Sequence, residues 1–259
     1  MRDLADVRSW LCDMDGVLIK DGAMIAGADE FLDRLRATGR EYLILTNNSL
    51  FTPRQLSEDL STMGLDVPAE RMWTSALALA QFVSSQRPGG SAFVIGRESI
   101  HDALANAGYR EDANQPDYVV LGETMEYSYD DFATAIRLVA AGSHFVSTNP
   151  EPNGPSIEGS LPGCGAMSAV IESATGVTPY IVGKPNSVMI REAMSVIEAA
   201  TDSTVMVGDR METDILAGVD AGVRTLLVLS GANIAADAQR YPYQPSRVAT
   251  SVAELIEEL

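Results

Sequence analysis

The sequence predicts an α/β protein built on parallel sheets in a doubly wound arrangement. Two observations support this fold class. Short apolar runs without polar alternation recur along the chain, which is typical of strands that are buried on both faces of a parallel sheet. Between these runs, apolar residues such as Ile190, Ala193 and Ile197 recur at helical spacing. Strands that alternate with helices favour βαβ units with right-handed crossovers.

Six apolar runs have the length of a buried strand. They are residues 10–12, 42–45, 93–95, 118–121, 205–207 and 225–229. The spacing of Phe132, Ile136 and Val139 predicts a helix in the middle of the chain. Thr52 followed by Pro53 is typical of an N-cap and the first helical position.

Three further segments have clear local signals. The stretch 149–165 is rich in Pro and Gly and predicts an ordered loop. Ser49 is expected to cap the helix that follows it. The acidic stretch 253–259 carries apolar residues at helical spacing, and we expect it to dock as a helix with one solvated face.

The composition limits the classes of partner. The 259 residues include 36 Asp and Glu but 18 Lys and Arg, so the formal net charge is −18, which argues against broad binding to nucleic acid or to anionic membranes. No run approaches the ~20 apolar residues of a membrane helix, and we expect a soluble, cytoplasmic protein. Cys12 and Cys164 form neither a disulfide framework nor a paired metal site, and ordinary reduced thiols are expected.

Four polar clusters lie at the carboxyl ends of predicted strands or at the start of a following helix. They are Asp13-Met14-Asp15-Gly16, Thr46-Asn47-Asn48-Ser49, Gly183-Lys184-Pro185, and Gly208-Asp209 with Asp214 five residues on. In open parallel sheets, ligands bind outside the carboxyl ends of the strands, so these clusters can converge on one site. Each cluster alone is a weak signal. The D-x-D-G pattern also opens calcium loops, but no glutamate occupies the later position that such a loop needs.

The charges of these clusters predict a cation. Asp13, Asp15 and Asp209 would repel one another at one point unless a cation neutralises them or one stays protonated. Mg²⁺ fits best, because it takes few protein carboxylates and keeps water and phosphate oxygens as ligands. The metal ion and Lys184 would then form a local positive field in an otherwise acidic protein.

A phosphate ester is the ligand that suits such a field. The Thr46 hydroxyl and the backbone amides at Asn47 and after Asp13 can donate to its oxygens. An Asp carboxylate can attack phosphorus to give an aspartyl-phosphate. A second Asp two residues on can protonate the leaving oxygen and later deprotonate the attacking water.

These motifs, in this order, resemble those of the haloacid dehalogenase superfamily of phosphatases. DMDGV resembles its first motif, LTNNS its second, GKP its third and GDRMETDI its fourth. The strings TNP, GDRMETDILAG and TLLVLSG are similar to the NagD and 4-nitrophenylphosphatase branch. The similarity extends from about residue 8 to residue 231. The carboxylate at Asp15 argues against the dehalogenases of the superfamily, which lack it.

The resemblance implies a role for each matched residue. Asp13 would be the nucleophile and Asp15 the general acid and base. Thr46, Asn47 and Lys184 would bind the phosphate. Mg²⁺ would be held by the same Asp13 and by the main-chain carbonyl of Asp15.

The fourth motif would complete the metal site. The resemblance implies that Asp209 is a direct ligand, and that Asp214 supports the ion through water or through a neighbouring ligand. Whether Arg210 contacts the substrate is left open. The same holds for Glu151, which stands after TNP where relatives often have Asp.

The resemblance also implies a domain organisation. A Rossmann-like core of residues 1–80 and 184–259 would carry the catalytic groups. An inserted α/β cap of residues 81–183 would exclude water and read the leaving group. Dimers through the cap are common in this branch, so a homodimer is also implied.

The resulting hypothesis is a Mg²⁺-dependent phosphomonoester hydrolase. Its substrate would be a small phosphometabolite of the nucleotide or sugar phosphate class, and its intermediate an aspartyl-phosphate. Two alternatives remain at this point. One is a phosphotransferase or phosphomutase, which passes the phosphoryl group to an acceptor other than water. The other is a non-catalytic protein that binds a phosphometabolite on the same scaffold.

Overall fold

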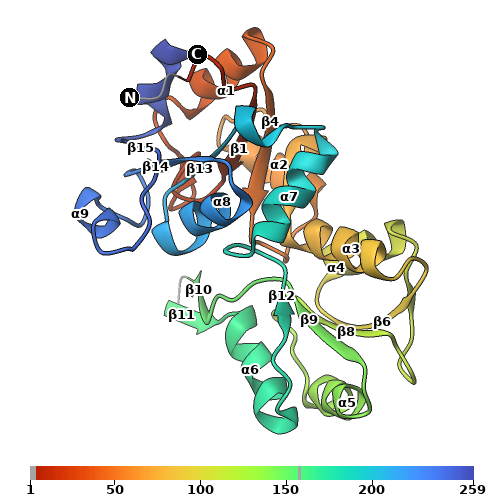
Figure 1. Ribbon diagram of the computed structural model, residues 1–259. Coiled ribbons are helices and arrows are strands. Elements are labelled where there is room, and N and C mark those ends of the chain that lie inside the picture. Colours follow the sequence, from red (N-terminus) through yellow and green to blue (C-terminus); the bar gives the residue numbers. More distant parts are fainter. Residues whose placement is uncertain (1–3, 157–158) are drawn as a thin grey trace. The chain divides into compact units, whose positions relative to one another are not determined.

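The computed structural model describes residues 4–156 and 159–259, and the chain divides into two compact units (Figure 1). The first unit contains the described residues of Met1–Thr46, together with Pro53–Trp73 and Lys184–Leu259. The second contains Asn47–Thr52 and Thr74–Gly183. Residues 47–52 and 74–80, which the sequence analysis assigned to the core, therefore lie in the second unit. The division into a catalytic core and a cap stays a prediction.

The first unit is built on a six-stranded sheet in the order β15-β14-β13-β1-β4-β5. Its strands are β1 (Ser9–Asp13), β4 (Glu41–Thr46), β5 (Met72–Thr74), β13 (Thr204–Gly208), β14 (Arg224–Val228) and β15 (Arg247–Ala249). The pairs from β15 through β4 are parallel, and every residue of β1 and β13 is buried. The α/β class and the expectation of strands buried on both faces are confirmed.

Short helices flank this sheet. They are α1 (Ala28–Ala37), α2 (Pro53–Thr62), α7 (Ser187–Val196), α8 (Leu216–Ala221) and α9 (Ala235–Ala238), with single 3-10 turns at Ala69–Arg71 and Thr201–Ser203. Helix α2 begins at Pro53, as predicted. Helix α7 begins where the Asn186 side chain accepts a hydrogen bond from the Val188 N–H at 3.0 Å. The C-terminal segment forms a 3-10 helix, Val252–Glu258, that packs on α1.

The centre of the first unit is apolar. Trp10 of β1 is fully buried and meets Phe31 of α1 edge to face, with ring centroids 5.5 Å apart. This geometry is favourable for aromatic rings and adds to the area that they bury. A small hairpin, β2 (Ile19–Lys20) and β3 (Ala23–Met24), follows β1. The core therefore anchors the strand that ends at Asp13.

The second unit has its own parallel sheet, in the order β12-β9-β8-β6-β7. Its strands are β6 (Ser91–Ile95), β7 (Arg110–Glu111), β8 (Tyr118–Leu121), β9 (His144–Ser147) and β12 (Tyr180–Ile181), and its helices are α3 (Ser75–Gln86), α4 (Glu98–Asn106), α5 (Tyr129–Ala140) and α6 (Cys164–Thr175). Helices α3 and α4 lie on one face of the sheet, and α5 and α6 lie on the other (Figure 1). The helix expected around Phe132 is α5, which starts where the Ser128 hydroxyl accepts from Asp131 N–H.

Two local expectations are wrong. The stretch 149–165 is not simply a loop, because it contains an antiparallel pair, β10 (Asn153–Ser156) and β11 (Gly159–Pro162). Residues 157–158 of that stretch lie outside the described residues. Ser49 does not cap a helix. It is buried four residues before α2, and its hydroxyl meets Glu123 Oε2 and Thr148 Oγ1, each at 3.0 Å.

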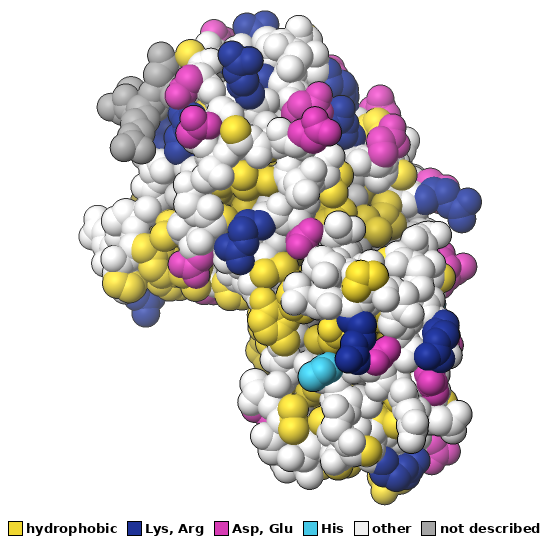
Figure 2. All heavy atoms as spheres, turned by 45° about the vertical axis from the view of Figure 1, so that its right-hand side comes forward, with side chains coloured by type: hydrophobic (Ala, Val, Ile, Leu, Met, Phe, Trp, Pro, Cys, Tyr) yellow, Lys and Arg dark blue, Asp and Glu magenta, His cyan; other side chains and the backbone are white. Residues whose placement is uncertain are grey.

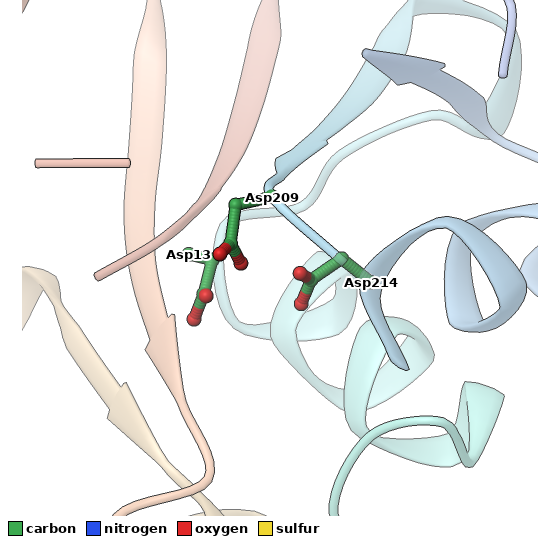
Figure 3. A group of neighbouring side chains, drawn as sticks. All are labelled: Asp13, Asp209 and Asp214. Atoms are coloured by element: carbon green, nitrogen blue, oxygen red, sulfur yellow. The ribbon is translucent and has the colours of Figure 1, made fainter. Parts of the chain in front are cut away.

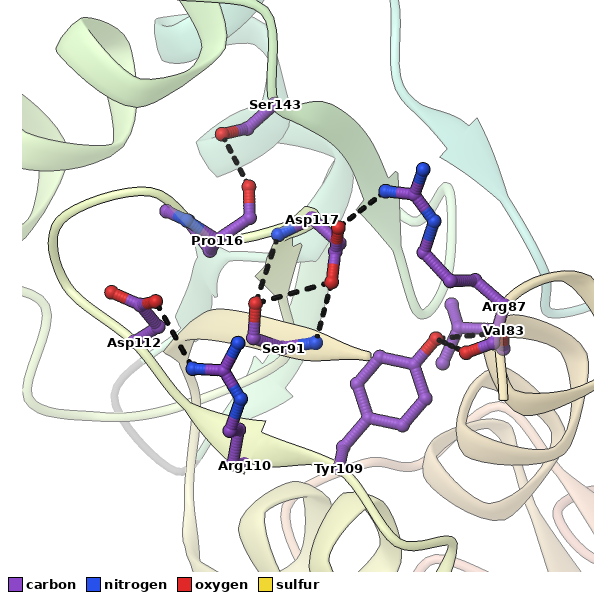
Figure 4. Close-up of polar contacts among 9 residues, drawn as sticks. All are labelled: Val83, Arg87, Ser91, Tyr109, Arg110, Asp112, Pro116, Asp117 and Ser143. Atoms are coloured by element: carbon purple, nitrogen blue, oxygen red, sulfur yellow. Dashed lines mark hydrogen bonds and ion pairs between the residues drawn. The ribbon is translucent and has the colours of Figure 1, made fainter. Parts of the chain in front are cut away.

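A polar cluster ties the second sheet to α3 (Figure 4). Asp117, just before β8, accepts hydrogen bonds from the Ser91 N–H at 2.8 Å and from the Ser91 hydroxyl at 3.2 Å. Arg87, which follows α3, donates to the same carboxylate. These donors stabilise the charged form and lower the pKa of Asp117, with the Ser91 N–H as the largest contribution. The Tyr109 hydroxyl donates to the carbonyls of Val83 and Arg87, at 2.8 and 2.7 Å.

Charged side chains are scattered among uncharged and hydrophobic ones on the molecular surface (Figure 2). On the face drawn in Figure 2, basic and acidic side chains are interspersed. Among residues 4–156 and 159–259, no helix is long and apolar enough to cross a bilayer.

Candidate active site

The register of the first sheet gathers the predicted site residues of this unit. Strand β1 lies between β13 and β4. Asp13, the last residue of β1, stands beside Leu45 of β4, and Cys12 stands beside Val207 of β13. Thr46 therefore ends β4 next to Asp13. Asp209 directly follows β13 at the same carboxyl edge, which is where ligands bind in open parallel sheets.

Lys184 links two carboxylates at this edge. Its ammonium lies 2.6 Å from Asp13 Oδ1 and 2.7 Å from Asp214 Oδ1. The lysine is 3% exposed, and Asp13 is 8% exposed. Burial by itself would lower the pKa of Lys184, but the charges of Asp13 and Asp214 outweigh burial and raise that pKa. The lysine is therefore a fixed cation.

Three carboxylates form an acid cluster, defined as Asp13, Asp209 and Asp214 (Figure 3). One oxygen of each lies within 4.8 Å of the others. A π-helical turn, Met211–Ile215, carries Asp214. The Arg210 N–H donates to Asp214 Oδ2 at 3.1 Å, which fixes the carboxylate against the start of this turn.

Burial and mutual repulsion perturb the acid cluster. Burial is the largest cause that raises the pKa of Asp13, and the charge of Asp214 raises it further. Burial, followed by the charge of Asp214, raises the pKa of Asp209 to about 6. Lys184 alone cannot balance three carboxylates. The cluster thus favours either bound protons or a further cation.

The donor set of the acid cluster fits a hard divalent cation. Asp209 Oδ1 is buried and has no hydrogen-bond partner among the described residues, while Asp209 Oδ2 accepts from the Ala232 N–H at 2.6 Å. An orphaned carboxylate oxygen beside two further carboxylates is the environment that such an ion prefers. With Lys184, a divalent ion would balance the charge of the three acids.

Asp15 is not a member of the acid cluster. Its side chain is exposed, but nearby protein atoms still desolvate it enough to raise its pKa, against the opposing charges of Lys184 and Arg210. Gly16 follows with a φ of 80°, a backbone conformation that favours glycine. The turn after β1 therefore keeps Asp15 close to Asp13 in the chain but in contact with solvent.

Thr46 and Asn47, the two predicted phosphate-binding residues of the second motif, fall in different units. Thr46 is buried at the end of β4, in the first unit. Asn47 belongs to the second unit, where its carbonyl accepts from the Ser75 hydroxyl at 2.6 Å and from Asn149 Nδ2 at 3.0 Å. The Asn47 side chain donates to Glu151 Oε1 at 2.7 Å. Glu151 thus holds Asn47, a contact that the sequence analysis did not foresee.

The loop 230–233 is a part of the site that sequence reasoning missed. The Asn233 N–H donates to the Asp209 carbonyl at 3.2 Å, and Asn233 Oδ1 accepts from the Met211 N–H at 2.7 Å. Backbone donors of this kind have no residue-type signature. The available signal was position, because the loop follows β14, the neighbour of β13.

Comparison with known proteins identifies the family. The model of haloacid dehalogenase-like hydrolases matches residues 10–110, and a second model of the same class, HAD-hydrolase-like, matches residues 181–255. The chain is 51% identical over 248 residues to a dihydroxyacetone phosphatase of Corynebacterium glutamicum, which spans 95% of this chain and 90% of the relative. It is 40% identical over 249 residues to the ribonucleotide monophosphatase NagD of Escherichia coli, with 96% and 98% covered.

A solved structure agrees with these relatives. The crystal structure of a 4-nitrophenylphosphatase from Thermotoga maritima superposes with a TM-score of 0.93 at 30% identity and covers 99% of both chains. These relatives are named as phosphatases rather than as mutases or binding proteins. The chain therefore belongs to the haloacid dehalogenase-like hydrolases, in their branch of NagD-like phosphatases.

Proposed function

We propose that this phosphatase hydrolyses small phosphate esters with the help of Mg²⁺ and through an aspartyl-phosphate on Asp13. The observation that carries the proposal is the buried contact of Lys184 with Asp13 and Asp214, beside Asp209. Lys184 and a divalent ion together would balance the three acids. They would also provide the positive charge that a phosphate ester needs in a protein whose net charge is −18.

In the first step, the Asp13 carboxylate attacks phosphorus and the bond to the leaving oxygen breaks. Asp15 gives its proton to that leaving oxygen, so the product leaves as an alcohol. The desolvation that raises the pKa of Asp15 favours the protonated acid that this step requires. Lys184 and the Thr46 hydroxyl orient the phosphoryl oxygens through donated hydrogen bonds.

In the second step, the Asp15 carboxylate takes a proton from a water molecule, which attacks phosphorus. The bond from phosphorus to Asp13 breaks, and inorganic phosphate is released. The proton that Asp15 takes from the water restores its acid form, so Asp15 acts as acid and then as base within one turnover. Asn47 would contribute its backbone amide to the phosphate site, held in place by Glu151.

The residues that would hold Mg²⁺ are Asp13, the main-chain carbonyl of Asp15, and Asp209. Asp214 would act beside them, because its Oδ1 already contacts Lys184. When bound, Mg²⁺ supplies the charge that stabilises negative phosphoryl oxygens.

The names of two relatives support a substrate class. One of them is named for dihydroxyacetone phosphate and another for ribonucleotides, so we propose a small sugar phosphate or nucleotide. The second unit would act as a cap that selects the leaving group, and a homodimer through this cap is part of the proposal. We also place the enzyme in the cytoplasm.

The decisive experiment measures phosphate release from a panel of small esters. The panel includes 4-nitrophenyl phosphate, dihydroxyacetone phosphate and ribonucleoside monophosphates, each with Mg²⁺ and with EDTA. Wild-type enzyme is expected to release phosphate with Mg²⁺ and to stop with EDTA. Asp13→Asn is expected to fold and to release none. Asp33→Asn, the same change on an exposed side chain of α1, is the matched control and is expected to behave as wild type.

A quenched reaction tests the covalent intermediate directly. Wild-type enzyme is mixed with substrate, quenched in acid and digested, and the peptide that contains Asp13 is examined by mass spectrometry. A phosphorylated Asp13 peptide is expected in the wild type and absent in Asp13→Asn. Substantial turnover by pure Asp13→Asn would remove Asp13 as the nucleophile, and an isomerised sugar phosphate would indicate transfer instead of hydrolysis.

A further inference from the structure

The loop 230–233 encloses one oxygen of Asp209. The Ala232 N–H donates to Asp209 Oδ2 at 2.6 Å. The backbone of Gly231 lies so close to this carboxylate that a Cβ on Gly231 would stand 2.0 Å from Oδ2 and 2.5 Å from Cγ. Only a residue without a side chain permits this approach. Asp209 Oδ2 is therefore occupied by the loop, whereas Oδ1 has no hydrogen-bond partner among the described residues.

The same loop also fixes the backbone that follows this carboxylate, from the Asp209 carbonyl to Met211. The Asn233 N–H donates to the Asp209 carbonyl at 3.2 Å. Asn233 Oδ1 accepts from the Met211 N–H at 2.7 Å, at the start of the π-helical turn that carries Asp214. One residue, Asn233, thus couples the segments that present two members of the acid cluster, through its backbone N–H and its side chain.

The loop is in turn anchored to the segment after β1. Lys20 Nζ donates to the carbonyls of Ser230 and Gly231, at 3.0 and 3.2 Å. The Ser230 hydroxyl donates to the Gly16 carbonyl at 2.7 Å. The position of Asp209 is consequently tied to the turn that carries Asp15.

We infer that loop 230–233 is the positioning element of the metal site, and that it assigns Asp209 Oδ1 as the oxygen that binds the ion. Gly231 and Asn233 are its positioning residues. Gly231 allows the Ala232 amide to hold Oδ2, and this leaves Oδ1 free to face Asp13 and Asp214. This inference rests on the proposed metal site but adds residues that lie outside the four sequence motifs.

The test measures binding of Mg²⁺ alone to the full-length, metal-free protein by isothermal titration calorimetry. Gly231→Ala is expected to bind Mg²⁺ ~10–100-fold more weakly, the range seen when the partner of a metal ligand is lost. Asn233→Ala is expected to weaken binding in the same direction. Gly154→Ala is the control, because a Cβ there meets nothing within 4 Å, and it should bind as the wild type does.

Two further measurements separate positioning from folding. Urea unfolding of the metal-free variants is expected to show that Asn233→Ala still folds cooperatively, with a midpoint lowered by the loss of one hydrogen bond to the Met211 N–H. That variant then decides the question if Gly231→Ala does not fold. Asn233→Asp keeps an acceptor oxygen for Met211 N–H and is expected to bind Mg²⁺ at least as tightly as wild type. Binding by Asn233→Asp that is as weak as that of Asn233→Ala would overturn the role of Asn233.

The outcomes distinguish this inference from the proposed function. Wild-type affinity in both Gly231→Ala and Asn233→Ala would overturn the inference and leave the metal site intact. Wild-type protein without saturable Mg²⁺ binding would overturn the metal site and the inference with it.

Discussion

Asp209 makes the metal-free protein less stable at neutral pH. Burial raises the pKa of Asp209 from its ordinary value of 3.8 to about 6. Because the folded state binds this proton more tightly than the unfolded state, the contribution to stability is complete below pH ~4 and is lost as the pH rises through ~6. At ~1.4 kcal/mol per pH unit, the loss amounts to ~3 kcal/mol.

Asp209→Asn removes this titration and keeps an acceptor for the Ala232 N–H. In EDTA at about pH 7.5, the free energy of unfolding of the variant is therefore expected to exceed that of wild type by ~3 kcal/mol. At about pH 4.5 the difference should shrink to ~1 kcal/mol, because folded Asp209 then carries its proton while most unfolded chains do not. Saturating Mg²⁺ should make wild type more stable than Asp209→Asn, since an ion that binds only the folded wild type stabilises it.

Urea unfolding followed by tryptophan fluorescence is the assay. The two tryptophans of the chain, Trp10 and Trp73, both lie in the first unit and are buried. Their signal therefore reports the unit that contains Asp209. Equal stability of Asp209→Asn and wild type in EDTA at about pH 7.5 would refute the reasoning, because it would mean that burial of this charge costs nothing.

Two further predictions concern the other charged groups. Lys184→Met leaves Asp13 and Asp214 without their cation. It should lower the free energy of unfolding by ~3–5 kcal/mol, measured by urea unfolding in EDTA at neutral pH, and abolish phosphate release. Unchanged stability would contradict the contact of the lysine with the two carboxylates. Asp117→Ala loses its hydrogen bonds from Ser91, so it should destabilise the second unit by ~1.5–3 kcal/mol in thermal unfolding followed by circular dichroism. Because the pKa of Asp117 is lowered, this cost should be full above pH ~4 and shrink below it; a cost that grows in acid would argue against the assignment.

The gathering of polar residues at the carboxyl edge of the first sheet was predictable because parallel strands end together. Asp13, Thr46 and Asp209 each follow an apolar run, and the register of β4, β1 and β13 brings these ends side by side. The placement of Lys184 beside Asp13 could be expected only from the need to balance charge and from the motif. Its second partner, Asp214, was not foreseen as a contact of the lysine.

The errors arose where backbone groups and long-range partners decide the structure. Loop 230–233 holds Asp209 through amide donors, and such donors are the same for every residue type except proline. Ser49 has the composition of an N-cap, but its hydroxyl is taken by Glu123, a residue 74 positions away. The β10–β11 pair is rich in Pro and Gly, so its composition favoured a loop over strands.

The central position of β1 has a consequence for how the enzyme loses activity. Strand β1 is paired on both sides and buried throughout, so its amides can exchange with deuterium only when the whole first unit opens. Local fluctuations at the surface leave strand β1 intact. Inactivation by heat should therefore coincide with exchange at Leu11 and Cys12, and not precede it.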